Sequence, residues 1–283
     1  MIETQNLHRS FGKIGVVREL ALNVPEGSIY GFLGVNGAGK TTTIRMLMGI
    51  LPPTKGTITI DDITSKRVPM KSRRKLSYVS QEQYFYHWAN PLQLGNFVAG
   101  CYPNWDKVDF LDLLDLFFIP RKRRVDQMSG GMKTKLALAL SIASNPRVMI
   151  FDEPTTGLDP LARREFMDLV VSQSRKHGRT TFFSSHLVNE VERCADVIGI
   201  INEGSLLYEG KLDTLLQRTR KLPDARHSEQ LAGIAERWST LDDQGQVWHL
   251  NEDKVWDGLE IPADAMLPAS LEDCFLSLVK RSH

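Results

Sequence analysis

Eight consecutive residues, Gly34 to Thr41, have the types and spacing of a phosphate-binding loop: Gly-Val-Asn-Gly-Ala-Gly-Lys-Thr, between an apolar run at 28–33 and a helix expected from residue 40. Glycines let the backbone bend so that amide N–H groups converge on phosphate oxygens, at the positive end of the helix dipole. Lys40 would reach the terminal phosphates, and Thr41 would hold Mg²⁺. An ordinary glycine turn is the alternative, but it requires neither the lysine nor the hydroxyl. The residues expected to contact nucleotide here are Gly34, Asn36, Gly37, Gly39, Lys40, Thr41 and Thr42.

Two acids, Asp152 and Glu153, follow the apolar run 148–151. A buried strand that ends in carboxylates places them at the ligand crevice of an open parallel sheet. We expect Asp152 to support Mg²⁺ coordination and Glu153 to polarise the attacking water as a general base. Acids after strands are common, so the pair gains its meaning from the phosphate-binding loop. Together the two motifs indicate a nucleoside triphosphatase.

A second candidate anion site is the sequence Ser129-Gly130-Gly131, where the serine is a helix N-cap and the glycines leave bare amides. One protein has no obvious need for two phosphate sites per nucleotide. At this point the chain resembles the ABC ATPase family, over residues 2 to about 220 and with the motifs in the family's order. In that family the serine-glycine-glycine signature of one subunit closes on the ATP held by another. Met128 and Met132 replace the usual leucine and glutamine beside the signature, and neither change touches the glycine amides.

The resemblance implies roles for four further residues. Phe11 takes the place of the aromatic that stacks on adenine, although a core position is the alternative. Gln81 matches the glutamine that contacts Mg²⁺ or water and senses the membrane partner. Asp159 matches the loop that crosses the dimer interface, although a helix N-cap would also explain it. His186 matches the histidine that hydrogen-bonds the γ-phosphate.

An aromatic segment, 83–88, follows Gln81 and has two interpretations. It either packs inside a helical insert or forms the groove that, in the family, receives a short helix from the membrane subunit. The stretches 102–106 and 271–275 resemble subunits of bacterial exporters that pair with a separately encoded permease. The implied partners are therefore a permease and a second ATPase subunit, as a homodimer or a heterodimer.

The composition is that of a globular protein whose charges nearly cancel. Of 283 residues 42% are hydrophobic, and 35 Lys and Arg oppose 34 Asp and Glu, so no global field indicates nucleic acid as a partner. The three cysteines are few and far apart, which suits a reducing cytosol. The N-terminus has no secretory-signal pattern, and no apolar stretch is long enough to cross a bilayer. We therefore expect a peripheral protein at the cytoplasmic face of the membrane.

Strand and helix signals alternate along most of the chain and predict an α/β fold. We expect a mostly parallel central sheet, an antiparallel layer from the first residues and a helical insert at about 84–145. Asp159, Pro160 and Gly178 mark the start and end of one helix. Residues 1–220 are predicted to form the ABC-type nucleotide-binding domain, and 221–283 a small C-terminal appendage. Residues 218–227 suggest a linker, 246–250 a strand and 271–280 a helix.

The function implied is the ATP-binding, ATP-hydrolysing motor of a transporter. A soluble ABC ATPase of chromosomes, repair or ribosomes is the rival, but those types carry long coiled coils or two ATPase domains in one chain. A regulatory subunit that only binds ATP is a second rival. It would need neither Glu153 nor His186.

Overall fold

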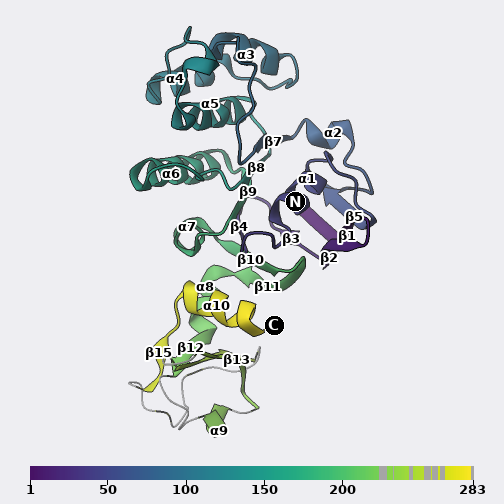
Figure 1. The fold of residues 1–283 in the computed structure, drawn as a ribbon, viewed down its shortest axis with the longest axis vertical. Coiled ribbons are helices and arrows are strands. Elements are labelled where there is room, and N and C mark those ends of the chain that lie inside the picture. Colours follow the sequence, from purple (N-terminus) through teal and green to yellow (C-terminus); the bar gives the residue numbers. More distant parts are fainter. Residues whose placement is uncertain are drawn as a thin grey trace.

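The computed structural model describes residues 1–222, 228–231, 233–241, 245–251, 256, 261 and 265–281. Figure 1 shows the helical insert at one end of the long axis, the C-terminal sheet at the other end and the central sheet between them. The arrangement confirms the α/β architecture expected from the sequence.

The central sheet has six strands in the order β11-β10-β4-β9-β8-β7. Its strands are β4 (Ile29–Leu33), β7 (Leu76–Val79), β8 (Val148–Asp152), β9 (Thr180–Ser185), β10 (Val197–Asn202) and β11 (Ser205–Lys211). Every neighbouring pair from β10 to β7 is parallel, and only β11 is antiparallel, at the edge. Strands β4, β8 and β9 are buried throughout, as expected for continuous apolar runs covered on both faces. Their carboxyl ends therefore meet at one edge.

An antiparallel layer formed by the first part of the chain covers one face of this sheet. It contains β1 (Ile2–Phe11), β2 (Ile14–Leu20), β3 (Asn23–Val24), β5 (Lys55–Ile60) and β6 (Ile63–Ser65). Helix α1 (Lys40–Leu47) shares one buried cluster with both sheets, in which Ile44 packs with Val24 and Phe182. The short helix α2 (Met70–Arg73) precedes β7. This packing fixes α1 against the sheet that carries the acids.

The helical insert between β7 and β8 is confirmed. It comprises α3 (Pro91–Ala99), α4 (Lys107–Leu116), the 3₁₀ helix η1 (Val125–Gln127) and α5 (Gly130–Ala143). Helices α6 (Pro160–His177) and α7 (Val188–Cys194) then alternate with strands. Asp159 caps α6 by accepting from the amides of Leu161 and Ala162, both at 3.0 Å, and Gly178 ends α6 with φ 59°. Both helix boundaries predicted from residue type are correct.

The described residues of the C-terminal part form more helices and strands than the sequence predicts. It contains α8 (Leu212–Arg218), β12 (Thr219–Leu222), α9 (Ser228–Leu231), β13 (Ala235–Leu241), β14 (Gly245–Leu250), β15 (Leu267–Pro268) and α10 (Leu271–Arg281). The predicted linker is wrong for residues 219–222, because β12 pairs with β14 in a four-stranded sheet; residues 223–227 lie outside the described residues. The strand at 246–250 and the helix at 271–280 are confirmed. A division near residue 220 stays a prediction.

Helix α10 packs back onto the first part of the chain. Leu271 and Cys274 share a buried cluster with Val191 and Cys194 of α7. The Leu271 amide also lies 3.5 Å from a carboxylate oxygen of Glu192. The appendage therefore contacts the helix that follows His186.

Candidate functional site

Three loops converge where the parallel strands β4, β9 and β8 end side by side. The loop 34–39 follows β4, Glu153 follows β8, and His186 follows β9. They surround a cleft of about 430 Å³. Its lining residues are Val16, Asn36, Gly37, Gly39, Lys40, Thr41, Thr42, Gln81, Glu153, Thr156 and His186. The structure thus brings most of the predicted site together.

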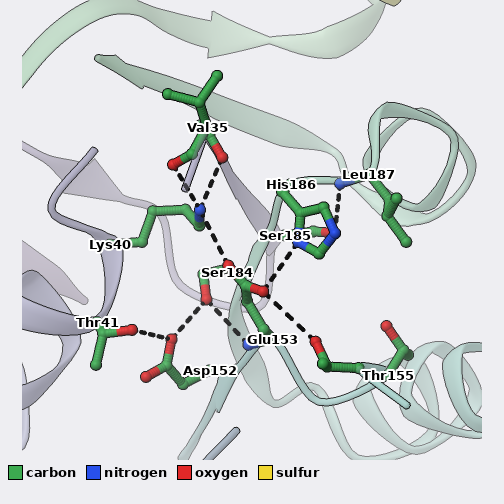
Figure 2. Close-up of polar contacts among 12 residues, drawn as sticks. Val35, Lys40, Thr41, Asp152, Glu153, Thr155, Ser184, Ser185, His186 and Leu187 are labelled. Atoms are coloured by element: carbon green, nitrogen blue, oxygen red, sulfur yellow. Dashed lines mark hydrogen bonds and ion pairs between the residues drawn. The ribbon is translucent and has the colours of Figure 1, made fainter. Parts of the chain in front are cut away.

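The phosphate-binding loop depends on glycine for its backbone path. Gly39 has φ 106°, and a Cβ atom there would lie 2.8 Å from the Val16 carbonyl oxygen. Helix α1 begins at the next residue, Lys40, so its free amides face the cleft. The Lys40 ammonium donates to the carbonyls of Gly34, at 2.7 Å, and Val35, at 3.0 Å (Figure 2). Lys40 is buried, and its charge needs a nearby counterion.

The counterion of Lys40 is the Glu153 carboxylate. Oε1 lies 3.0 Å from Lys40 Nζ, and Oε2 lies 2.9 Å from Nδ1 of His186 (Figure 2). The Glu153 backbone is left-handed, with φ 45°, and its amide donates to Ser184 Oγ at 3.1 Å. Burial acts to raise the pKa of Glu153, but Lys40 and His186 outweigh it and lower that pKa. The carboxylate is therefore held in its ionised form by these two partners.

Asp152 faces the opposite side of the strand end and is 1% exposed. Its Oδ1 accepts from Ser184 Oγ at 2.9 Å and from Thr41 Oγ1 at 3.1 Å (Figure 2). Burial raises the pKa of Asp152, partly opposed by these hydrogen bonds. A buried carboxylate beside a hydroxyl gains from a cation. Thr41 and Gln81 line the cleft, whereas Asp152 contacts it through Thr41, and these oxygen donors suit a hard divalent ion.

The second candidate anion site lies apart from the cleft. Ser129 caps α5 by accepting from the Met132 amide at 3.3 Å, as predicted. A Cβ atom on Gly130 would meet nothing within 4 Å, and one on Gly131 only a Leu158 methyl at 3.7 Å. Of the residues described as lining the Lys40 cleft, none comes from α5 or is Asp159. The chain's own packing thus gives no reason for two glycines at this helix start, where glycine weakens the helix.

The predicted adenine-stacking residue is at the surface. Phe11 is 49% exposed, so the core interpretation is wrong. The Arg9 guanidinium carbon lies 4.6 Å from the centre of its ring. Phe11 is not among the residues that line the Lys40 cleft in the described structure. One ring face contacts Arg9, which leaves stacking to the other face.

Aromatic side chains of the segment 83–88 form an exposed cluster with α3. The ring centre of Tyr86 lies 5.7 Å from that of Trp88 and 6.2 Å from that of Phe97. These three side chains are 56%, 62% and 61% exposed, so core packing is wrong for them. Phe85 alone in the segment packs against the main core. We call Tyr86, Trp88 and Phe97 the aromatic patch.

Three residues of the site were not predicted. Val16 of β2 and Thr156 line the cleft, and Ser184 joins Asp152 to the Glu153 backbone. Val16 is an ordinary strand residue, and its sequence carries no signal for this role. Thr156 and Ser184 lie next to predicted motifs, and their hydroxyls were the available signal. Within the described ranges, no helix combines the length and apolar character needed to cross a membrane.

Known proteins are similar to this chain in sequence and in fold. Residues 17–156 match the family model described as ABC transporter. The bacitracin transport ATP-binding protein BcrA of Bacillus licheniformis is 34% identical, over 99% of this chain and 97% of that protein. A solved ATP-binding subunit of an ABC transporter is 26% identical with a TM-score of 0.69, over 82% of this chain and 95% of that one.

A dimeric ATP-binding cassette solved with ADP and phosphate has the same fold, with a TM-score of 0.68 and 23% identity, over 75% of this chain and 99% of that one. The sequence similarity to BcrA covers nearly the whole length of both proteins. The chain therefore belongs to the ABC transporter family, as one of its ATP-binding, ATP-hydrolysing subunits.

Proposed function

We propose that two chains hold ATP and Mg²⁺ between them, each nucleotide lying between the Lys40 cleft of one chain and the Ser129-Gly130-Gly131 signature of the other. The observation that carries this proposal is the pairing of Glu153 with Lys40 and His186 at the cleft. A subunit that only bound ATP would not need a buried carboxylate there. The same residues therefore favour an ATPase over a regulatory module.

The phosphates of ATP bind the loop amides, Lys40 and the start of α1. Thr41, Asp152 and Gln81 would hold Mg²⁺ through hydroxyl, carboxylate and amide oxygens. When bound, Mg²⁺ would neutralise negative charge on the phosphates. Phe11 offers its free ring face to adenine.

In hydrolysis, Glu153 orients a water molecule and accepts its proton as the water oxygen bonds to the γ-phosphorus. The bond to the β–γ bridging oxygen breaks, and its electron pair leaves with ADP. The proton then passes from Glu153 to solvent. His186 holds Glu153 through Nδ1 and turns its other ring nitrogen to the γ-phosphate. Lys40 must leave Glu153 to engage the phosphate, which frees the base.

The second chain supplies the other wall of the site. Gly130 faces open space, and the cap on α5 aims free amides outward. Asp159, exposed at the start of α6, completes the contact across the interface. The dimeric cassette solved with ADP and phosphate supports a two-chain site. A homodimer is the simplest form, because one chain carries both halves.

The partner in the membrane is a separate permease, and the chain binds it from the cytoplasmic face. BcrA is named for transport, which supports this over a soluble ABC ATPase. The aromatic patch is the surface we assign to permease contact, since exposed clustered aromatic rings are typical of protein interfaces. ATP-driven closure of the dimer moves the permease only if the closed dimer binds one orientation of the permease better than the other.

Replacing Glu153 by glutamine tests the catalytic assignment. Glu153→Gln keeps the size of the side chain but removes the proton acceptor, so turnover should fall by roughly 10²- to 10⁴-fold. ATP binding should survive, and the closed dimer should accumulate in light scattering. Lys40→Ala should instead lose binding. Parental hydrolysis by Glu153→Gln would mean that another group is the base.

The pH dependence of hydrolysis tests the exchange of Lys40 from Glu153 to phosphate. In the free chain Lys40 and His186 lower the pKa of Glu153, whereas burial and the phosphate charge raise it once Lys40 has moved. The acid limb of kcat should therefore lie at higher pH than the acid limb of kcat/KM. The residual activity of Glu153→Gln should lack this limb. Coincident limbs would contradict the exchange.

A substitution in the signature tests the two-chain site. Gly130→Asp places a carboxylate where the partner's γ-phosphate is expected, so ATP-driven dimer closure should be lost while the monomer still binds nucleotide. Gly130→Ala is the matched control, because its Cβ meets no atom of the chain. It should fold normally and retain more closure. Loss of monomer binding in Gly130→Asp would place the signature in the same chain's site.

Removing the aromatic patch tests the permease contact. Tyr86→Ala with Trp88→Ala should reduce recovery of the chain with membranes that contain its permease, since about 1 kcal/mol or more is lost at each interface hot spot. ATP binding should not change. Phe118→Ala is the control, because Phe118 is 89% exposed in the same insert but lies outside the patch. Equal recovery of both variants with membranes would mean that the permease binds another surface of the chain.

A further inference from the structure

Glu190 is a buried carboxylate that the proposed mechanism does not use. It lies in the first turn of α7 and is 8% exposed. Buried acids are stable in proteins when they are paired and hydrogen-bonded. The partners of Glu190 therefore show what it holds.

Both oxygens of Glu190 accept hydrogen bonds from residues close in sequence to the proposed catalytic residues. Oε1 accepts from Thr155 Oγ1 at 2.6 Å, and Oε2 accepts from Ser185 Oγ at 2.7 Å. Thr155 lies two positions after Glu153, and Ser185 directly precedes His186. Figure 2 shows Thr155 and Ser185 on the loops next to Glu153 and His186.

These contacts close a ring. It runs from Glu153 along the chain to Thr155, across Glu190 to Ser185, on to His186 and back to Glu153 through the 2.9 Å hydrogen bond. Strands β8 and β9 are neighbours in the central sheet. Glu190 adds a side-chain link between the end of β9 and the loop that follows β8, besides the hydrogen bond between Glu153 and His186.

A third contact reaches the far end of the loop between β8 and α6, the same loop that begins with Glu153. Arg163 Nε, in the first turn of α6, lies 3.5 Å from Glu190 Oε1, and Nη2 of the same guanidinium donates to the Leu158 carbonyl at 3.3 Å. Leu158 is next to Asp159, which we place at the dimer interface. One carboxylate thus contacts the loop after β8, the end of β9 and the start of α6.

We propose that Glu190 is a positioning residue that holds the loop from Glu153 to Asp159 in register with His186. The proposal rests on the proposed roles of Glu153 and His186. Glu190 does not touch the cleft, because it is not among the described lining residues. It acts through Thr155 and Ser185.

The contacts of Glu190 predict which kinetic constant changes when Glu190 is replaced. Lys40 is also held by the carbonyls of Gly34 and Val35, which lie outside the ring, so phosphate binding depends less on the ring than the position of Glu153 does. The water-activating geometry of Glu153 depends on the ring. A misplacement near 1 Å in a catalytic group can lower a rate by about 10²-fold. Loss of Glu190 should therefore lower kcat rather than raise KM.

The test uses the full chain with Glu190→Ala and Glu190→Gln, measuring steady-state MgATP hydrolysis, ATP binding and thermal unfolding. Glu190→Ala should lower kcat by roughly 10- to 100-fold with little change in KM. Glu190→Gln should fall between, because an amide can accept from only one of the two hydroxyls. The control is Glu192→Gln, an exposed glutamate on the same helix, which should keep parental kcat.

A double-mutant cycle shows whether Glu190 acts through its two partners. Thr155→Val with Ser185→Ala should lower kcat similarly, and adding Glu190→Gln should cause little further loss. A parental kcat in Glu190→Gln overturns the proposal. So does a loss of kcat that only follows a lower unfolding midpoint. Should Glu190→Ala not fold, Glu190→Gln and the partner variants decide.

Glu153→Gln, assayed in parallel, separates this proposal from the proposed function. If Glu153→Gln is inactive while Glu190→Gln and the partner variants are parental, only the role of Glu190 fails. If Glu153→Gln is fully active, the catalytic assignment itself fails.

Discussion

The ion pair between Lys40 and Glu153 is the constraint on which the site depends. Both side chains are buried, at 4% and 9% exposure, and each would otherwise leave an uncompensated charge. Breaking such a pair by removing one partner costs roughly 3–5 kcal/mol. The pair forms because β4 and β8 end at the same edge of a parallel sheet, separated only by β9. In the proposed mechanism, ATP supplies a new partner for Lys40, and that exchange couples nucleotide binding to the release of the base.

In the proposed mechanism, the nucleotide site is incomplete within one chain. The cleft is built from the ends of the central strands, whereas the signature lies at the start of α5, in the helical insert (Figure 1). Its glycines meet almost nothing in their own chain. In the two-chain account, the binding free energy of ATP contributes to closing two subunits, and a permease attached to both experiences that closure as a shift between its conformations.

Motifs with local geometry were predictable from sequence, because turn chemistry and capping act over a few residues. The phosphate loop, the acids after β8, and the caps Ser129 and Asp159 are examples. Residues that depend on tertiary approach were not. Val16 lines the cleft from β2, and Glu190 on α7 contacts Thr155 only once the central sheet is assembled. The sequence of β12 resembles a linker because two basic residues separate the buried Thr219 and Leu222. Both of these residues pair with β14, far along the chain.

The central claim is that a complete site needs two chains, and mixing two defective chains tests it most directly. One chain carries Lys40→Ala and the other Gly130→Asp, both with Glu153→Gln so that ATP is not consumed. A mixed dimer contains one site with an intact Lys40 loop facing an intact signature. Light scattering and retained ATP should show mixed dimers with about one nucleotide per pair, although neither chain alone closes. A mixture that retains no ATP, or a single variant that closes by itself, would contradict the account.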